Sequence, residues 1–115
     1  MKKQHESDSN VHSQTMIEKL TRENPWVWIV VQDADGDSQF MGLQDQETDI
    51  GFIPIFLTKE EALDCYMQMP RKKGHRYEVQ AIQYNDLARQ TADTGFMLFM
   101  LDGEGKVREK LVPHH

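Results

Sequence analysis

The sequence contains little of what disulfide-rich, membrane-spanning or nucleic-acid-binding proteins require. Cys65 is its one cysteine, so no disulfide can form within the chain, and a reduced, cytoplasmic setting is expected. No apolar run approaches the roughly 18 residues of a membrane span, and the polar start of the chain does not read as a signal peptide. Residues 26–57 hold no lysine or arginine, and the chain shows no overall basic footprint. We therefore expect a cytoplasmic protein that binds neither membranes nor nucleic acids.

The chain is long enough for one domain and one core. Its 115 residues are 38% hydrophobic, and the apolar residues come in short blocks, which is the pattern of a globular chain. Residues 1–12 are polar and without periodicity, so they are interpreted as a tail. We expect a single domain over residues 13–111 and a short tail over 112–115, whose two histidines are left out of the fold argument.

Negative charge is concentrated in one part of the sequence. The net charge is −6, and the excess lies in residues 26–57. Asp33, Asp35 and Asp37 have the alternate spacing that opens a calcium loop, but such a loop needs glycine at its sixth position and glutamate at its twelfth. Here the glycine is fourth and the twelfth residue is Gln44. The segment is therefore interpreted as a turn in a solvated acidic loop, and no metal or cofactor is expected.

Three segments have the pattern of helices. Thr15 and Glu18 have capping-box spacing before residues 16–23. Thr58 and Glu61 repeat that spacing and predict a helix that Pro70 ends. A third helix is predicted from a cap at Asn85 or Asp86 to about Asp93.

Six segments have the pattern of strands, and Pro54 restricts one of them to an edge, an end or a bulge. They are residues 26–31, 40–43, 50–53, 77–82, 96–101 and 106–108. Helices placed between strands predict an α/β (α+β) domain of two or three layers. We expect a mixed sheet of five or six strands, two main helices packed on one face and a short N-terminal helix.

Two segments are similar to a known family. Residues 52–63 combine an apolar strand with proline, an aromatic residue, a threonine cap, acidic residues and Ala-Leu. Residues 79–103 follow with a strand, a helix beginning Asn85-Asp86 and a glycine-led apolar strand. This layout resembles the SseB-like N-terminal domain family over residues 26–105. The resemblance implies a small α/β domain of poorly defined function, linked by name to serine sensitivity, with no agreed catalytic residues.

No group of residues has the pattern of a catalytic or metal site. Cys65 lies on the apolar face of its predicted helix, as an inert packed cysteine does. The five histidines lack zinc spacing, no serine lies in a glycine-flanked elbow, and neither a phosphate loop nor a dinucleotide fingerprint is present. We therefore predict that the chain is not an enzyme, with no catalytic residues and no metal ligands.

One basic cluster has a functional alternative. Residues 71–76 hold four cations and a histidine, which could bind a phosphate or an acidic partner, or form a solvated loop. The candidate ligand-binding residues are Arg71, Lys72, Lys73, His75 and Arg76.

Two predicted strands are apolar on both faces. Residues 26–31 and 96–101 carry large apolar side chains at successive positions, so both faces of the sheet need cover. If the main helices cover one face, Trp26 and Trp28 become candidate interface residues. The second face is then covered by the N-terminal helix or by a second copy in a homodimer. The leading hypothesis is a non-enzymatic protein-interaction or regulatory module that self-associates, and the alternative is a small domain that binds anionic ligands through residues 71–76.

Overall fold

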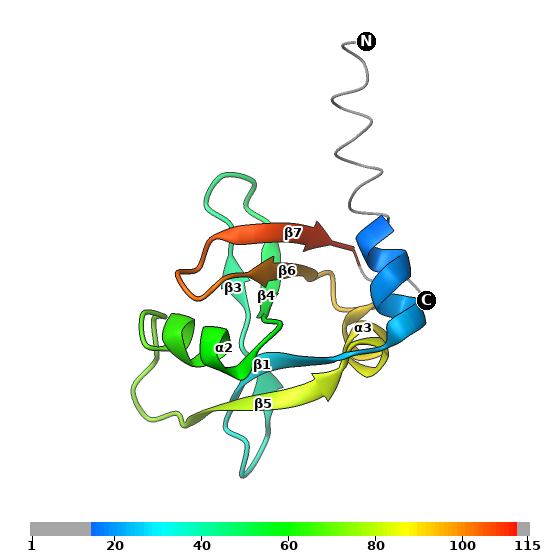
Figure 1. The fold of residues 1–115 in the computed structure, drawn as a ribbon. Helices are drawn as coiled ribbons and strands as arrows, with labels where there is room; N and C mark the ends of the chain where they lie inside the picture. The colour runs from blue at the N-terminus through cyan, green and yellow to red at the C-terminus, as the bar shows by residue number, and fades with distance from the viewer. Residues whose placement is uncertain (1–14, 113–115) are drawn as a thin grey trace.

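A computed structural model describes residues 15–112 and shows a mixed α/β domain (Figure 1). The predicted tail over residues 1–12 and the two terminal histidines lie outside the described residues. A helix over residues 15–23 comes first. The labelled elements are β1 (Trp26–Gln32), β2 (Gln39–Phe40), β3 (Leu43–Gln44), β4 (Gly51–Ile55), α2 (Lys59–Tyr66), β5 (Tyr77–Gln83), α3 (Tyr84–Thr91), β6 (Met97–Leu101) and β7 (Val107–Leu111). The predicted α/β class is confirmed, and none of the described helices is long and apolar enough to cross a membrane.

The strands form two linked sheets. Their orders are β2-β1-β5 and β3-β4-β6-β7, with β4 and β6 parallel and the other pairs antiparallel. Trp28 and Phe56 exchange backbone hydrogen bonds of 2.8 and 2.9 Å, which join β1 to the end of β4. The segment predicted as one strand, residues 40–43, instead bends and contributes β2 to one sheet and β3 to the other.

Pro54 lies inside β4, at a point where no N–H group is needed. One edge of β4 faces β3 and β1. On this edge, Phe52 pairs with Leu43 of β3, and Phe56, just after β4, bonds to Trp28 of β1. Because the backbone direction alternates along a strand, Pro54 faces the gap between these two pairings. No ladder hydrogen bond therefore needs the N–H that proline lacks. On the opposite edge of β4, the parallel register with β6 places Pro54 beside Phe99.

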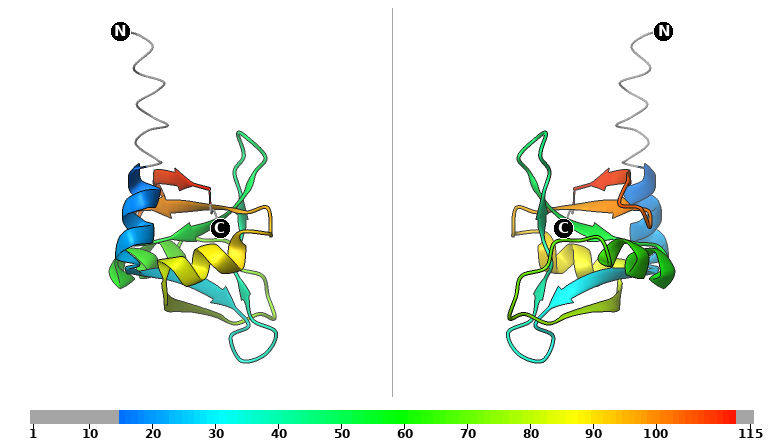
Figure 2. Two further views of the ribbon diagram at one scale, coloured as in Figure 1. Left: turned by 90° about the vertical axis from the view of Figure 1, so that its right-hand side faces the viewer. Right: turned by 90° about the vertical axis from the view of Figure 1, so that its left-hand side faces the viewer.

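The two main helices pack on opposite sides of β1, so their predicted placement on one face is wrong. Helix α3 and Leu20 of the N-terminal helix pack with Val27 and Ile29, whereas α2 packs with Val30 and the half-buried Trp28. Figure 2 shows that the two helices also lie near opposite ends of β1, with α3 toward the viewer in its left panel and α2 toward the viewer in its right panel. A strand that is apolar on both faces receives one helix on each face. The sheet is therefore covered within one chain, with the N-terminal helix contributing to the cover.

The helix ends show which caps the sequence reveals. Thr58 is the N-cap of α2, as predicted, and its hydroxyl accepts a hydrogen bond of 3.1 Å from the Glu61 N–H. The predicted caps of α3, Asn85 or Asp86, are wrong, because α3 already begins at Tyr84 and its N-cap residue offers no side-chain bond. The Asn85 N–H instead donates to Asn24 Oδ1 at 2.9 Å. This cap comes from the loop before β1, 61 residues earlier in the chain.

Candidate interaction surface

Strand β5 is one of the two edge strands of its sheet. It pairs with β1 over all seven of its residues, from Tyr77 opposite Gln32 to Gln83 opposite Trp26. Within residues 15–112, no strand pairs with its other edge. Figure 1 shows β5 along the lower margin of the fold, with β1 above it. The structure thus leaves a full-length strand edge open to a further strand.

Two hydrogen bonds at the ends of β5 show which of its backbone groups point outward. The Asp33 N–H donates to the Arg76 carbonyl at 2.6 Å, and the Tyr84 N–H donates to the Pro25 carbonyl at 2.9 Å. Because the direction alternates along an antiparallel ladder, the even-numbered residues between Arg76 and Tyr84 bond toward β1. The outward N–H and C=O groups therefore belong to Tyr77, Val79, Ala81 and Gln83.

The other edge strands carry features that discourage pairing, and β5 does not. Strands β2 and β3 are two residues long. Strand β7 carries the exposed Arg108 and Lys110, and the β6–β7 register shifts at Met100/Leu101. Strand β5 has one charged residue, Glu78, has no proline, glycine or lysine, and keeps an uninterrupted register with β1. Short length, edge lysines and bulges are the devices that protect sheet edges, so β5 is the unprotected one.

Both predicted interface residues lie beside this edge. Trp26 pairs with Gln83 and Trp28 with Ala81, so the two indoles stand on the face shared with the odd-numbered residues of β5. Trp26 is 60% exposed. Trp28 is half-buried, and Lys59 Nζ lies 5.7 Å from the centre of its ring. The sequence identified the tryptophans but not the strand edge beside them, because edge position follows from topology.

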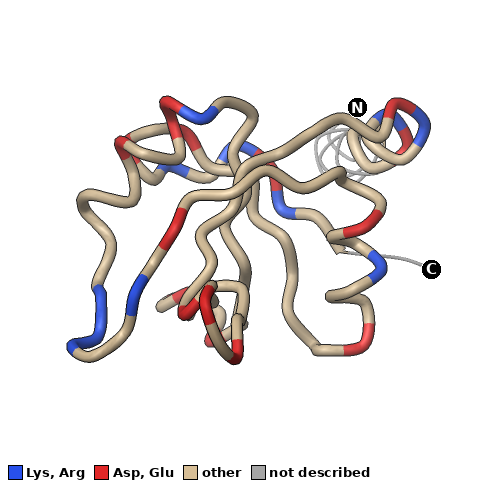
Figure 3. The backbone as a smooth tube through the Cα atoms, turned by 90° about the horizontal axis from the view of Figure 1, so that it is seen from below, with Lys and Arg blue, Asp and Glu red and all other residues tan. Residues whose placement is uncertain are grey.

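The basic loop is folded against the acidic loop. His75 Nδ1 lies 2.7 Å from Asp33 Oδ2, and Arg76 donates to Asp35 at 2.9 Å. The Arg76 N–H also donates to Asp33 Oδ1 at 3.1 Å. These contacts, with the His75 bond the largest cause, hold the pKa of Asp33 below its usual value. Two of the five predicted anion ligands, His75 and Arg76, are thus engaged by carboxylates. Figure 3 shows acidic and basic positions interspersed along the backbone.

Two of the three remaining cations, Arg71 and Lys72, lie at a small pocket. Arg71 stacks over the Tyr66 ring at 4.8 Å, and the Lys72 N–H donates to the Tyr77 hydroxyl oxygen at 2.9 Å. A pocket of about 210 Å³ lies between these residues and the bend that joins β2 to β3. Arg71 and Lys72 line it, whereas Lys73 is exposed in the turn beyond and does not. The pocket is large enough for a small anion.

Two features of the described residues carry groups of the kind used in catalysis or metal binding, the Cys65 thiol and a hollow lined by carboxylates. Cys65 is buried, and this burial, together with the charge of Asp102, raises the pKa of its thiol, which disfavours the reactive thiolate. An open hollow of about 580 Å³ beside it is lined by carboxylates, but Glu61 bonds to Arg108 at 2.6 Å and Asp102 accepts two backbone N–H groups at 2.9 Å. Among residues 15–112, no group of three or more His, Cys, Asp or Glu residues could hold a metal ion.

Comparison with protein-family models, with curated proteins and with solved structures finds no match to this chain. The resemblance to the SseB-like N-terminal domain family therefore stays a prediction.

Proposed function

We propose that the chain is a non-enzymatic interaction module that binds a protein partner by strand addition to β5. The observation that carries this proposal is the unprotected edge itself, seven residues long and with an uninterrupted register. In strand addition, main-chain hydrogen bonds supply affinity and flanking side chains supply specificity. Trp26 and Trp28 flank this edge, and aromatic residues of this kind dominate binding energy at interfaces, so they would add to the affinity of the main-chain bonds.

The exposed surface of Trp26 gives the site a source of affinity. A tryptophan buries about 150–250 Å² when it is fully covered. With 60% of Trp26 exposed, on the order of 100–150 Å² stays in contact with water. At roughly 25 cal/mol per Å², covering that surface contributes about 3 kcal/mol before the costs of association. In the β1–β5 register, Gln83 lies between this indole and the open edge, so the side chains of a partner strand would reach the indole across Gln83.

Site-specific photo-crosslinking in the cells that express the chain tests this proposal. A photoreactive amino acid replaces Ala81, whose side chain is exposed on the edge strand, and in a control it replaces Glu104, which is exposed in the turn between β6 and β7 of the other sheet. Strand addition predicts discrete crosslinked species from position 81 that position 104 does not give, and mass spectrometry identifies their components. Equal or absent crosslinking at the two positions would rule out β5 as a binding edge.

A second candidate function is the binding of a small anion at the pocket beside β2 and β3. It is favoured by the placement of Arg71 and Lys72 at the pocket wall, beside the half-buried Tyr77 of β5. Inorganic phosphate and phosphorylated metabolites should then raise the unfolding temperature of the wild type, and Lys72→Ala should abolish the rise. Lys73→Ala serves as the matched control, because Lys73 does not line the pocket. An equal response from all three proteins would exclude a specific site.

A further inference from the structure

The edge of β5 is self-complementary, and we propose that the strand it binds is β5 of a second copy of this chain. This inference rests on the proposed function and names its partner. The two strands run antiparallel about a twofold axis at Gln80, so that β2-β1-β5 continues into the β5-β1-β2 of the other copy. This twofold arrangement is the symmetry of most homodimers.

The outward backbone groups select this register. With Gln80 opposite Gln80, Val79 of one copy faces Ala81 of the other, and Tyr77 faces Gln83. All four of these residues point their N–H and C=O groups away from β1, because Arg76 and Tyr84 bond toward β1 and the direction alternates along the strand. The two copies form four such pairs by symmetry, and each pair exchanges two N–H···O bonds. Every outward group of β5 is then satisfied.

The neighbouring registers are poorer. An axis at Val79 or Ala81 leaves one end of each strand without a β5 partner, because Gln83 then faces loop residue 75 or Tyr77 faces Asn85 of α3. An axis at Glu78 sets the carboxylate of one copy directly opposite its twin, and like charges at that spacing are destabilising. With the axis at Gln80, Glu78 faces Ile82 and no two like charges are opposed.

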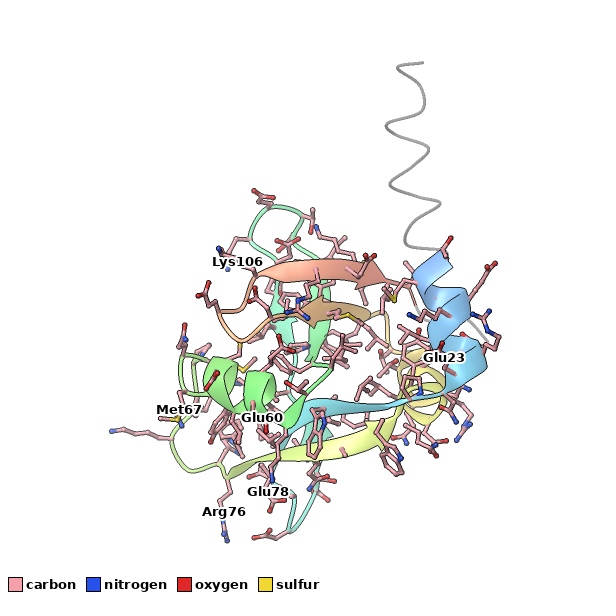
Figure 4. The ribbon with its side chains drawn as sticks, viewed as in Figure 1. Glu23, Glu60, Met67, Arg76, Glu78 and Lys106 are labelled. Atoms are coloured by element: carbon pink, nitrogen blue, oxygen red, sulfur yellow. The ribbon has the colours of Figure 1, made fainter. Side chains whose placement is uncertain are left out.

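The side chains that meet in this register are compatible on the face shared with α2. There the row across the dimer reads Trp28, Ala81, then Val79 and Val30 of the other copy, by combining the observed β1–β5 register with the twofold axis. Ala81 is exposed in one chain and becomes covered between apolar neighbours. In Figure 4, the labelled Arg76 and Glu78 lie at the lower margin of the fold.

The contact between the two copies is small, so we expect the dimer to be weak. One seven-residue strand and its flanking side chains bury less than the roughly 800 Å² per partner of a standard stable interface. The dimer should therefore dissociate on dilution, with a Kd in the micromolar range. Measurements must span that range to detect it.

The first test is the mass of the full chain by sedimentation velocity from 1 to 500 µM. The wild type should shift from monomer to dimer. Ala81→Pro removes an outward N–H without touching the bonds to β1, and its side chain is exposed, so the fold should persist. Because two hydrogen bonds per dimer are lost, Kd should rise on the order of thirtyfold. Ala81→Thr keeps the N–H and is the matched control, with Kd unchanged and circular dichroism confirming that all three proteins are folded.

The second test examines the register. Gln80→Lys and Gln80→Glu each place like charges at the twofold axis, so each variant alone should be monomeric. An equimolar mixture should dimerise, because lysine then faces glutamate across the axis. A mixture that stays monomeric while the wild type dimerises would overturn the Gln80 register.

The failure of this inference can be distinguished from failure of the proposed function. A wild type that is monomeric up to 500 µM, or a dimer that Ala81→Pro leaves unchanged, overturns self-pairing through β5. Strand addition as such is judged by the photo-crosslinks from position 81. If those crosslinks join the chain to a different protein, the function stands with another partner, and if they join two copies, both proposals hold.

Discussion

Asn24 joins three elements, and its substitution should destabilise the domain more than its exposure suggests. It adopts φ 47°, its N–H donates to the Leu20 carbonyl at 2.7 Å, and its Oδ1 accepts the Asn85 N–H at 2.9 Å. Asn85 in turn donates from its side chain to the Thr21 carbonyl at 3.0 Å. The end of the N-terminal helix and the start of α3 therefore cap each other through these two asparagines.

Two costs add in Asn24→Ala. Losing a helix cap costs about 1 kcal/mol. Alanine in the left-handed region costs about 1–2 kcal/mol, because its Cβ crowds the backbone and its side chain forms no compensating bond. Asparagine tolerates this conformation. We expect Asn24→Ala to lower the free energy of unfolding by about 2–3 kcal/mol. Asn24→Gly removes only the cap and should cost about 1 kcal/mol, while Asn24→Asp keeps the acceptor and favours the helix N-terminus, so it should cost little.

Urea unfolding of the four proteins, followed by circular dichroism at a concentration where self-association is negligible, measures these differences. The order of stability should be wild type and aspartate, then glycine, then alanine. If aspartate proves as unstable as alanine, Oδ1 is not the cap of α3. If glycine and alanine are equally unstable, the positive φ contributes nothing.

Three further outcomes follow from local contacts. Thr58→Ala should lower the free energy of unfolding by about 1 kcal/mol through loss of the α2 cap, and Thr58→Ser should restore most of it; a urea midpoint equal to that of the wild type would show that the hydroxyl is not used. Gly51→Ala would place a Cβ 2.7 Å from Phe96 Cε1, so it should cost about 1–3 kcal/mol, and the cost should shrink when Phe96 is also changed to Ala; additive effects of the two changes would contradict this contact. Cys65 should react with a soluble disulfide reagent far more slowly in the native protein than in urea, because its thiol is buried and its pKa is raised; equal rates would show that the site is open.

Elements with local signals could be predicted from the sequence. The Thr58 cap and the apolar strand β6, which lies between β4 and β7, are where the pattern placed them. The start of α3 could not be predicted, because its cap is supplied by Asn24 from a distant loop. The sides on which the helices pack also depend on tertiary structure. Apolar residues at the first six positions of β1 indicate that both faces are covered, but they do not indicate which helix covers which face.

The candidate surface could be predicted only in part. Trp26 and Trp28 were predicted as interface residues because large aromatic side chains on both faces of a strand need cover, and their role in an interface stays a prediction. The structure covers them differently from this expectation. Trp28 is half-buried beneath Lys59, the second face is closed by α3 and the N-terminal helix, and Trp26 alone stays largely exposed. The edge of β5 has no sequence signature, since a strand in mid-sheet and a strand at the edge have the same alternation.

The acidic and basic stretches, which look like separate features in the sequence, act together on β5. His75 and Arg76 precede the strand directly and are held by Asp33 and Asp35, which follow β1. At its other end, Gln83 donates to the Asn24 carbonyl at 3.4 Å and Tyr84 bonds to Pro25. The strand is thus anchored at both ends while its outer edge stays open. Because folding has already ordered this backbone, β5 itself loses little conformational entropy when a further strand pairs with it. The charge pairing therefore favours association through β5 without contacting the partner.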